Sequence, residues 1–302
     1  MLAPVIVFAY NRANHLEKTL DAHSKNYLAI ETDLFIFIDG PTKETEREKS
    51  EAVYQVAIKY SEAELFRKVV IERKTQNRGL ANSIIGGVST IISKYGKVIV
   101  VEDDLVSASD FLDFMNQGLD YYKSESRVGA ISGFSPVRRS KPKCDNGIFI
   151  SKTGNSCGWG TWEDRWEKVD WIIKDYACFI SDKKKQEAFD SIQYGISIML
   201  TRQMRGEIDS WAVRWDYFCF SNSLWTIYPE KSHICNVGFD GEGTNTNNKF
   251  EQRKRIVAQE SDFNMAPIEL LNDYTKMTAS SFKPTFFEKL YDFLLKRGML
   301  FF

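Results

Sequence analysis

The feature that most constrains the fold is an apolar run ending in three acids, KVIVVEDDL at residues 97–105. Four consecutive β-branched residues, 98–101, are typical of a central parallel strand covered by helices on both faces. Ligand sites in such sheets lie just beyond the carboxyl ends of the strands, where Glu102, Asp103 and Asp104 follow. Adjacent carboxylates repel one another unless a cation neutralises them, and Mg²⁺ or Mn²⁺ binds through one or two carboxylates plus substrate phosphates. The run therefore predicts a cation and diphosphate site, although a solvated acidic turn would also fit an isolated EDD triplet.

Three further strand and helix units precede this run. Short apolar segments at 4–9, 34–38 and 69–72 predict strands, and each is followed by apolar residues at helical spacing, such as Leu16 and Leu20. Alternation of this kind predicts an α/β fold with a mixed, mostly parallel, Rossmann-like sheet flanked by helices on both faces.

Polar residues follow each of these strands. Asn11 and Arg12 come after the first, Asp39 after the second, and Asn77 and Arg78 after the third. The carboxyl ends of parallel strands share one edge of the sheet, so the pattern predicts a site lined by both arginine and aspartate. Neither a GxGxxG fingerprint nor a P-loop occurs at these turns, so the phosphates would be held by a metal and side chains.

Composition excludes several classes of protein. A chain of 302 residues fits one large domain with an appendage, and a net charge of -1 with dispersed Lys and Arg argues against nucleic-acid binding. The five cysteines never form a CxxC pair, which argues against a disulfide framework and a zinc site. A reducing compartment is the simplest interpretation. No signal peptide or membrane-spanning run is evident, so we expect a cytoplasmic protein, at most bound to a membrane surface.

The second half of the chain is more polar and less regular. We expect a helix at 111–122, a fifth strand at 128–132, a loop at 135–146, one helix over 182–205 and a last short strand at 226–229. The polar, glycine-rich segment 238–248 predicts a loop that could act as a lid. Three tryptophans fall within residues 157–166. They suit either the core or an irregular loop, opened by the glycines beside Trp159, that presents aromatic faces to a sugar.

These motifs together resemble the GT-A fold of nucleotide-sugar glycosyltransferases. The residues that carry the likeness are VFAYNR at 7–12, Asp39, NRGLAN at 77–82 and VVEDDL at 100–105, with looser similarity around 158–162 and 209–211. The chain resembles bacterial family 2 enzymes and the N-acetylglucosaminyltransferase I type. This resemblance implies a UDP-sugar donor, Mn²⁺ or Mg²⁺, and a glycan or lipid-linked glycan acceptor.

The resemblance also implies roles for individual residues. Asp39 would accept the uracil N3-H, and Asp104 would bind the metal directly. The remaining donor-binding residues would be Ala9, Tyr10, Asn11 and Arg12 at the nucleotide, Arg78 and Asn82 at the ribose or diphosphate, and Glu102 and Asp103 at the donor sugar and ribose. Relatives often carry a histidine in the late loop where this chain has Asn245, so a histidine metal ligand is not expected there.

Inverting transfer needs a carboxylate that deprotonates the acceptor hydroxyl. Asp209 is the first candidate and Asp216 the second, with Glu163 and Asp240 as further candidates. Asp209 also suits the cap of a following helix. The residues expected to face the acceptor are Trp159, Trp162 and Trp211.

Residues 1–275 are expected to form the glycosyltransferase domain, with a nucleotide-binding half at 1–135 and an acceptor-binding half at 136–275. The tail 276–302 is amphipathic and aromatic; it predicts a helix that docks on the core, joins a homodimer, or lies on the inner membrane surface. Two rival functions remain open. A sugar-nucleotide nucleotidyltransferase has a similar sheet but needs a Gly-rich basic loop after the first strand, and a carbohydrate-binding protein could keep the site without catalysis.

Overall fold

The computed structural model describes residues 1–137, 143–238 and 258–283. Its strands are β1 (Val5–Ala9), β2 (Asp33–Ile38), β3 (Lys68–Arg73), β4 (Lys97–Glu102), β5 (Leu105–Ser107), β6 (Val128–Ser132), β7 (Ile148–Ser151), β8 (Trp159–Trp162), β9 (Trp225–Pro229) and β10 (Ile234–Asn236). Its α-helices are α1 (Ala13–Ser24), α2 (Arg47–Glu62), α3 (Leu80–Tyr95), α4 (Phe111–Tyr121), α5 (Glu163–Trp166), α6 (Tyr176–Ser181), α7 (Lys183–Ile192), α8 (Ile196–Met204), α9 (Trp211–Ser221) and α11 (Thr275–Ser281). Short 3₁₀ turns lie at Ala29–Glu31, Glu44–Glu46 and Ile268–Leu270.

Eight strands form one sheet in the order β3-β2-β1-β4-β8-β6-β9-β7, and β10 pairs with β5 in a second, small sheet. The pairs β1–β2, β2–β3, β1–β4 and β6–β9 are parallel, whereas β4–β8, β6–β8 and β7–β9 are antiparallel. The predicted mixed, mostly parallel sheet is confirmed.

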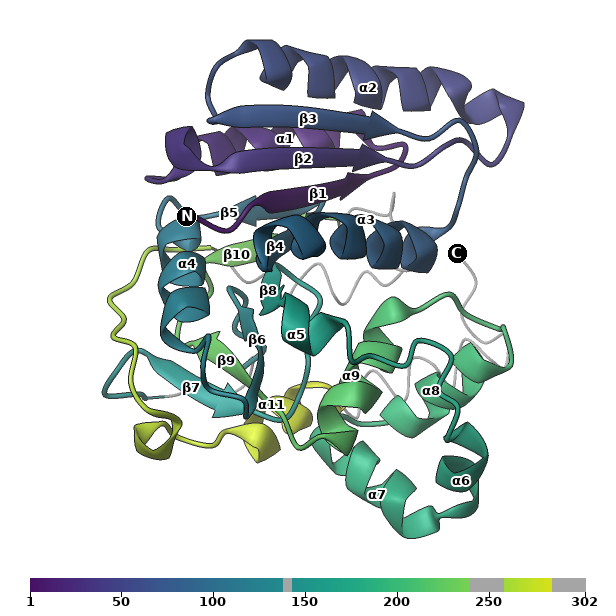
Figure 1. Ribbon diagram of the computed structural model, residues 1–302, viewed down its shortest axis with the longest axis vertical. Coiled ribbons are helices and arrows are strands. Elements are labelled where there is room, and N and C mark those ends of the chain that lie inside the picture. Colours follow the sequence, from purple (N-terminus) through teal and green to yellow (C-terminus); the bar gives the residue numbers. More distant parts are fainter. Residues whose placement is uncertain (138–142, 239–257, 284–302) are drawn as a thin grey trace, which may run out of the picture.

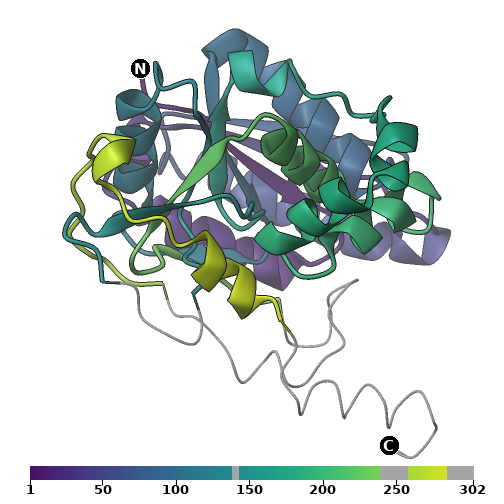
Figure 2. The same cartoon turned by 90° about the horizontal axis from the view of Figure 1, so that it is seen from below.

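Helices cover both faces of this sheet, which explains why its central strands are apolar throughout (Figures 1 and 2). In β1, Val5 and Val7 pack into the cluster that includes residues of α1, α2 and α4. The alternate residues, Ile6 and Phe8, pack into a second cluster with residues of α3, α5 and α9. Because both faces of the sheet are buried, a ligand can reach the polar side chains only at the ends of the strands.

The strand order places a topological switch point between β1 and β4. The chain runs from β1 outward to β2 and β3, then returns through α3 to β4 on the other side of β1. The two connections diverge from the shared β1–β4 boundary, and open α/β sheets bind ligands at the carboxyl ends of the strands at such a switch point.

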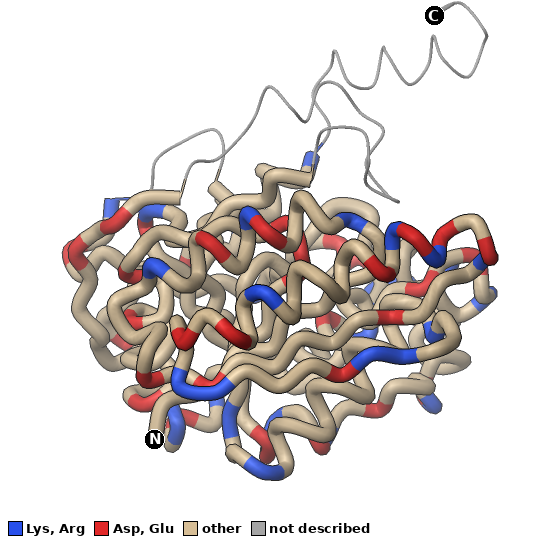
Figure 3. The backbone as a smooth tube through the Cα atoms, turned by 90° about the horizontal axis from the view of Figure 1, so that it is seen from above, with Lys and Arg blue, Asp and Glu red and all other residues tan. Residues whose placement is uncertain are grey.

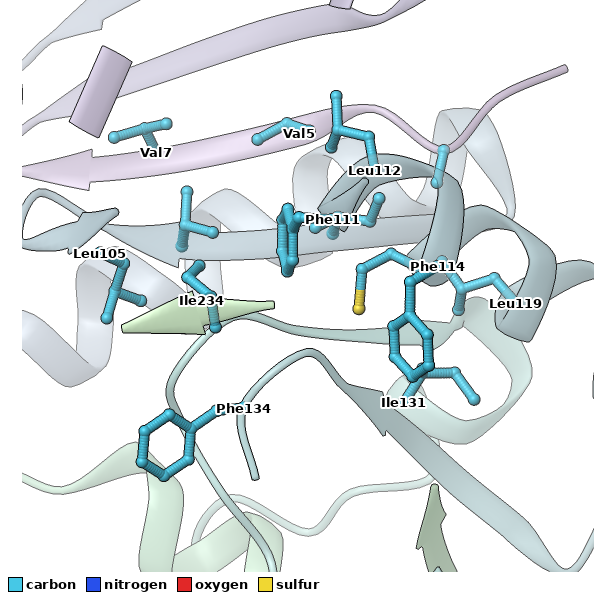
Figure 4. Close-up of a cluster of buried hydrophobic side chains, with 14 of the residues drawn as sticks. Val5, Val7, Leu105, Phe111, Leu112, Phe114, Leu119, Ile131, Phe134 and Ile234 are labelled. Atoms are coloured by element: carbon cyan, nitrogen blue, oxygen red, sulfur yellow. The ribbon is translucent and has the colours of Figure 1, made fainter. Parts of the chain in front are cut away.

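A hydrophobic cluster joins the large sheet to the β5–β10 sheet. In Figure 4, Phe114 of α4 lies beside Ile131 of β6, and Phe111 of α4 lies on the side of Ile234 and Leu105 from the small sheet. All five side chains are at most 1% exposed. This packing fixes β5 and β10 relative to the end of β4, and so supports the acids that lie between β4 and β5.

Helices α6, α7 and α8 form a small appendage that packs on α9. Its core includes Phe179, Phe189 and Leu200, together with Val213 and Tyr217 of α9. The single helix predicted over 182–205 is wrong, because the helical hydrogen bonding stops after Ile192 and restarts beyond Gly195, whose φ is +71°. A left-handed residue of this kind does not continue an α-helix.

Several predicted boundaries need correction. The segment 226–229 is not the last strand, since β10 follows it, and β5 and β7 were not predicted. The irregular loop predicted around Trp159 is a buried strand, β8, which pairs with both β4 and β6. The predicted lid at 238–248 lies outside the described residues except for Gly238.

The surface and the C-terminal part add little to the functional argument. Figure 3 shows basic and acidic residues interspersed along the backbone rather than gathered in one basic field. Among the described residues, no helix has the length and apolar character needed to cross a bilayer. The amphipathic tail predicted at 276–302 begins with the last residues of α11, and everything from residue 284 onward lies outside the described part of the chain.

Candidate functional site

The candidate site lies at the carboxyl ends of the neighbouring strands β1 and β4. Phe8 of β1 lies opposite Glu102 of β4 in the parallel ladder, so the residues that follow both strands emerge side by side. Arg12 follows β1 and precedes α1, while Asp103 and Asp104 connect β4 to β5. The structure thus brings together residues about ninety positions apart in the sequence, as the strand pattern predicted.

Arg12 pairs with both aspartates. Its Nη2 donates to Asp103 Oδ1 in a short contact, its Nε lies 3.4 Å from Asp103 Oδ2, and its Nη1 lies 3.0 Å from Asp104 Oδ2. The Arg12 side chain is only 18% exposed, and both carboxylates are more buried still. This partly desolvated ion pair keeps a guanidinium and two carboxylates at the switch point.

The acids carry more negative charge than Arg12 alone offsets. Burial, followed by the charges of Asp104 and Asp103, raises the pKa of Glu102 well above its usual range. Burial raises the pKa of Asp103 to about 6, even though the charge of Arg12 acts in the opposite direction. A site that disfavours its own carboxylate charges in this way favours an additional cation.

The carboxylates at this site can be compared with the ligands that the predicted divalent metal requires. Among the described residues, no three His, Cys, Asp or Glu side chains form a ready-made metal cage. Mg²⁺ and Mn²⁺ sites at phosphates need only one or two protein carboxylates, because the substrate supplies the other oxygens. The crowded carboxylates with raised pKa values fit such a cation, and Asp104 is the residue that would hold it. Asn245 lies outside the described residues.

Three residues that sequence reasoning did not assign to the site surround Asp104. Asn236 Nδ2 donates to Asp104 Oδ1 at 3.2 Å, and the amide of Val237 donates to the Asp104 carbonyl oxygen at 2.8 Å. A Cβ on Gly238 would clash with Asp104 Oδ2 and come within 3.0 Å of Arg12 Nη1. The predicted glycine-rich segment pointed to this region, but no local signal identified Asn236.

Asp39 lies at the carboxyl end of β2, where it was predicted. Its carboxylate accepts the backbone amides of Gly40, Arg78 and Gly79 at 2.9–3.1 Å. It therefore holds the loop before α3 in place. Arg78 lies between β3 and α3, and Asn82 Nδ2 donates to its carbonyl oxygen at 3.0 Å.

The predicted nucleotide-binding residues after β1 are held by the neighbouring loop. Ala9 is the last residue of β1, and its carbonyl oxygen accepts the amide of Asp39 at 3.0 Å. Tyr10 Oη donates to Glu46 Oε2 at 2.6 Å, and burial together with this contact raises the pKa of Tyr10. Asn11 is partly exposed between Tyr10 and Arg12.

Asp209 lies at the same edge of the sheet, between the first turns of α3 and α9. It does not cap α9 as expected, because the cap is Ser210, whose Oγ accepts from the Val213 amide at 3.3 Å. Instead, Asp209 Oδ2 accepts the amide of Ala81 at 3.2 Å and so caps α3. Asp209 is exposed, which leaves it accessible to a substrate hydroxyl.

Asp216, the second candidate base, lies on the buried side of α9. A Cβ on Gly154 would overlap its Oδ1, so the carboxyl group packs directly against that backbone. Burial raises the pKa of Asp216 from 3.8 to about 7. Glu163, a further candidate, donates its backbone amide to the Gly96 carbonyl oxygen just before β4, which places it at the opposite edge from the acids. Asp240 lies outside the described residues.

Replacement of Asp216 is expected to change how stability depends on pH. The folded chain retains a proton on Asp216 that the unfolded chain loses near pH 4, so stability falls as the pH rises from about 4 to 7. Each unit of pKa difference corresponds to about 1.4 kcal/mol. In urea denaturation at pH 5 and pH 8, Asp216→Asn should lose less stability than the unmodified protein. The exposed control Asp21→Asn should lose as much stability between pH 5 and pH 8 as the unmodified protein does. If Asp216→Asn also loses as much, the raised pKa of Asp216 is contradicted.

The three tryptophans predicted at the acceptor are core residues. Trp159, Trp162 and Trp211 are 1–3% exposed, and the Trp159 ring stacks on Trp211 with the centroids 4.8 Å apart. Trp162 Nε1 donates to the Leu119 carbonyl oxygen at 2.8 Å. Buried indoles have no free face for a sugar, so their predicted contact with the acceptor is wrong for this structure; the glycines beside Trp159 permit close strand packing instead.

Comparisons with known proteins give only distant likenesses. No protein-family model and no curated protein matches the sequence. Among solved structures, residues 1–349 of S. aureus TarS match with a TM-score of 0.44 and 13% identity, over 78% of this chain and 60% of that one. A longer S. aureus TarS structure matches with a TM-score of 0.38 and 15% identity, over 57% of this chain and 30% of that one.

Mouse xyloside xylosyltransferase 1, in its apo form, matches with a TM-score of 0.35 and 9% identity, over 74% of this chain and 84% of that one. The chain therefore spans less than two thirds of either TarS structure. TM-scores below 0.5 do not establish a shared activity.

Proposed function

We propose that this protein is a metal-dependent glycosyltransferase that moves a sugar from a UDP-sugar to a hydroxyl of a glycan or glycolipid acceptor, with inversion. The observation that supports this most is the cluster of Arg12, Asp103 and Asp104 at the switch point. The switch point of an open α/β sheet suits a nucleotide, and the combination of a guanidinium with crowded carboxylates suits a diphosphate together with a divalent cation.

The donor would lie across the ends of β1, β2 and β4. Asp39 and the loop from Ala9 to Asn11 would face the base, with Arg78 and Asn82 toward the ribose and diphosphate. Arg78 supports this arrangement because it follows β3 at the same edge as the acids. Asp39 already accepts three backbone amides, so it would meet the base as a preoriented acceptor.

The leaving group in this reaction is a diphosphate, whose negative charge grows as the sugar bond breaks. A divalent ion bound at Asp104 would supply Lewis-acid stabilisation of that charge. Arg12 would bind the diphosphate oxygens through its guanidinium, since phosphate can compete with the aspartates for the same donors. Glu102 and Asp103 would orient the donor sugar and ribose.

Asp209 is the better candidate for the base. It is exposed at the edge that carries the donor-binding residues, and the α3 amide holds its orientation. A base must reach the acceptor hydroxyl within hydrogen-bonding distance, which an exposed carboxylate can do and a buried one cannot without rearrangement. Asp216 therefore ranks second.

The experiment that tests the proposal is a panel of UDP-sugars incubated with the protein, with and without Mn²⁺, with release of UDP as the readout. Hydrolysis, in which water replaces the acceptor, needs no knowledge of the natural acceptor. We expect release from at least one donor in the presence of Mn²⁺ and loss of release in excess EDTA. Binding of UDP without turnover of any donor would favour a non-catalytic carbohydrate-binding protein. Formation of a UDP-sugar and pyrophosphate from UTP and a sugar 1-phosphate would favour a nucleotidyltransferase.

A further inference from the structure

Two hydrogen bonds attach the turn 236–238 to Asp104, and a third holds the turn together. The Asn236 side-chain amide donates to Asp104 Oδ1 at 3.2 Å, while its own oxygen accepts the Gly238 amide at 2.7 Å. The Val237 amide donates to the Asp104 carbonyl oxygen at 2.8 Å. Because both the nitrogen and the oxygen of the Asn236 side-chain amide are hydrogen-bonded, its orientation is fixed. The turn thus contacts both the backbone and the side chain of Asp104.

The turn is supported by a rigid part of the fold. Asn236 lies opposite Leu105 in the antiparallel β10–β5 pair, directly beside the acids. His233, immediately before β10, is fully buried, and its Nδ1 lies 2.7 Å from Asp110 Oδ1. Its backbone amide donates to the Gly133 carbonyl oxygen at 2.8 Å. These contacts hold β10 at both ends, so Asn236 can determine where the Asp104 side chain points.

The two oxygens of Asp104 have different partners. Oδ1 meets the neutral amide of Asn236, whereas Oδ2 meets the charged guanidinium of Arg12. A divalent cation repels a guanidinium but not a neutral amide. Binding of a cation at Asp104 is therefore compatible with the Asn236 contact, while the contact with Arg12 has to loosen and frees that guanidinium for phosphate oxygens.

Gly238 completes the arrangement by its lack of a side chain. A Cβ there would clash with Asp104 Oδ2 and come within 3.0 Å of Arg12 Nη1, so the Asp104 side chain would have to shift. The backbone of the turn thus lies against the Arg12–Asp104 pair, and a larger residue would displace both groups.

We propose that Asn236 is a positioning residue for the donor site, which holds one oxygen of Asp104 so that the other faces the cation and diphosphate, and that Gly238 is required for its close approach. This inference rests on the proposed function, because it assigns Asn236 a part in binding the metal and nucleotide through Asp104.

The test compares Asn236→Ala and Asn236→Leu with the unmodified protein, using calorimetry of UDP binding with Mn²⁺ and again with EDTA. Loss of a hydrogen bond to a charged group should weaken Mn²⁺-dependent UDP binding by about tenfold. UDP affinity in EDTA should stay unchanged, since the amide does not touch the nucleotide in this scheme. A purely structural role would lower both affinities or the melting temperature instead. Asn236→Leu keeps the volume of the side chain, so it distinguishes loss of the amide from loss of packing.

Gly238→Ala should weaken UDP binding both with Mn²⁺ and in EDTA, because its Cβ would displace Arg12 as well as Asp104. Two matched controls lie elsewhere: Gly86→Ala in α3, where a Cβ meets nothing within 4 Å, and Asn222→Ala at the end of α9. Both should bind as the unmodified protein does. If both Asn236 variants keep full Mn²⁺ dependence while Asp104→Ala loses it, the role of Asn236 is overturned. If Asp104→Ala also binds UDP normally with Mn²⁺, the proposed function itself fails.

Discussion

Asp104→Ala is expected to abolish the Mn²⁺-dependent part of UDP binding. Asp104 is the acid at the switch point whose Oδ1 is held by Asn236 and whose Oδ2 is neutralised by Arg12. Removal of one direct metal contact should cost several kcal/mol, which corresponds to a loss of affinity of at least about a hundredfold. Calorimetry of UDP with Mn²⁺ and with EDTA measures the effect directly.

Two variants keep this test specific. Asp104→Asn retains an oxygen that can accept from Arg12, so it separates the negative charge from the ion-pair geometry. Asp21→Ala removes an exposed acid from α1, where it pairs with Lys25 at 2.7 Å, and should leave binding unchanged. Unaltered affinity of Asp104→Ala for UDP with Mn²⁺, in a protein of normal melting temperature, would refute the metal site.

Asp209→Asn is expected to reduce UDP release by about a hundredfold while leaving UDP affinity intact. A general base typically contributes a factor of about 10² to 10⁴ in rate, and an amide cannot take up the proton. The substitution keeps the capping interaction, since the amide oxygen of asparagine can still accept from the Ala81 amide. Comparison of kcat for hydrolysis with the calorimetric affinity distinguishes catalysis from binding.

Asp209→Ala should lose both roles, with a lower melting temperature because the first turn of α3 is no longer capped. Ser210→Ala, which removes the neighbouring cap of α9, is the matched control and should lower stability by about 1 kcal/mol without affecting kcat. A large drop in kcat for Asp216→Asn and none for Asp209→Asn would transfer the role of base to the buried acid.

The strands and helices of residues 1–135 could be predicted from the sequence because their signals are local. Each strand there is a short apolar run that ends in polar residues, and parallel strands bring those ends to one edge. The meeting of Arg12 with Asp103 and Asp104 follows from that rule, although the ion pairs themselves depend on β1 and β4 being neighbours.

Residues after 135 carry weaker sequence signals of their secondary structure and contacts. In β8, the sequence Trp159-Gly-Thr-Trp162 looks like a loop because glycine usually interrupts strands, yet Gly160 leaves room for Met115 and Leu119 of α4. The contact between Asn236 and Asp104 joins residues 132 positions apart, and no periodicity predicts such a pair. The cap that Asp209 provides for α3 depends on how α3 and α9 pack, which the local sequence does not determine.

The way the large sheet is shared between the two halves of the chain limits how this protein can be engineered. β8, from the second half, lies between β4 and β6 of the first, so a fragment ending near residue 135 would expose an unpaired edge of β4 and leave β6 without a neighbour. Exposed strand edges of this kind promote aggregation. Residues 1–135 and 136–275 are therefore not exchangeable modules, and chimaeras are better built by replacing surface elements such as the α6–α8 appendage than by joining segments at that boundary.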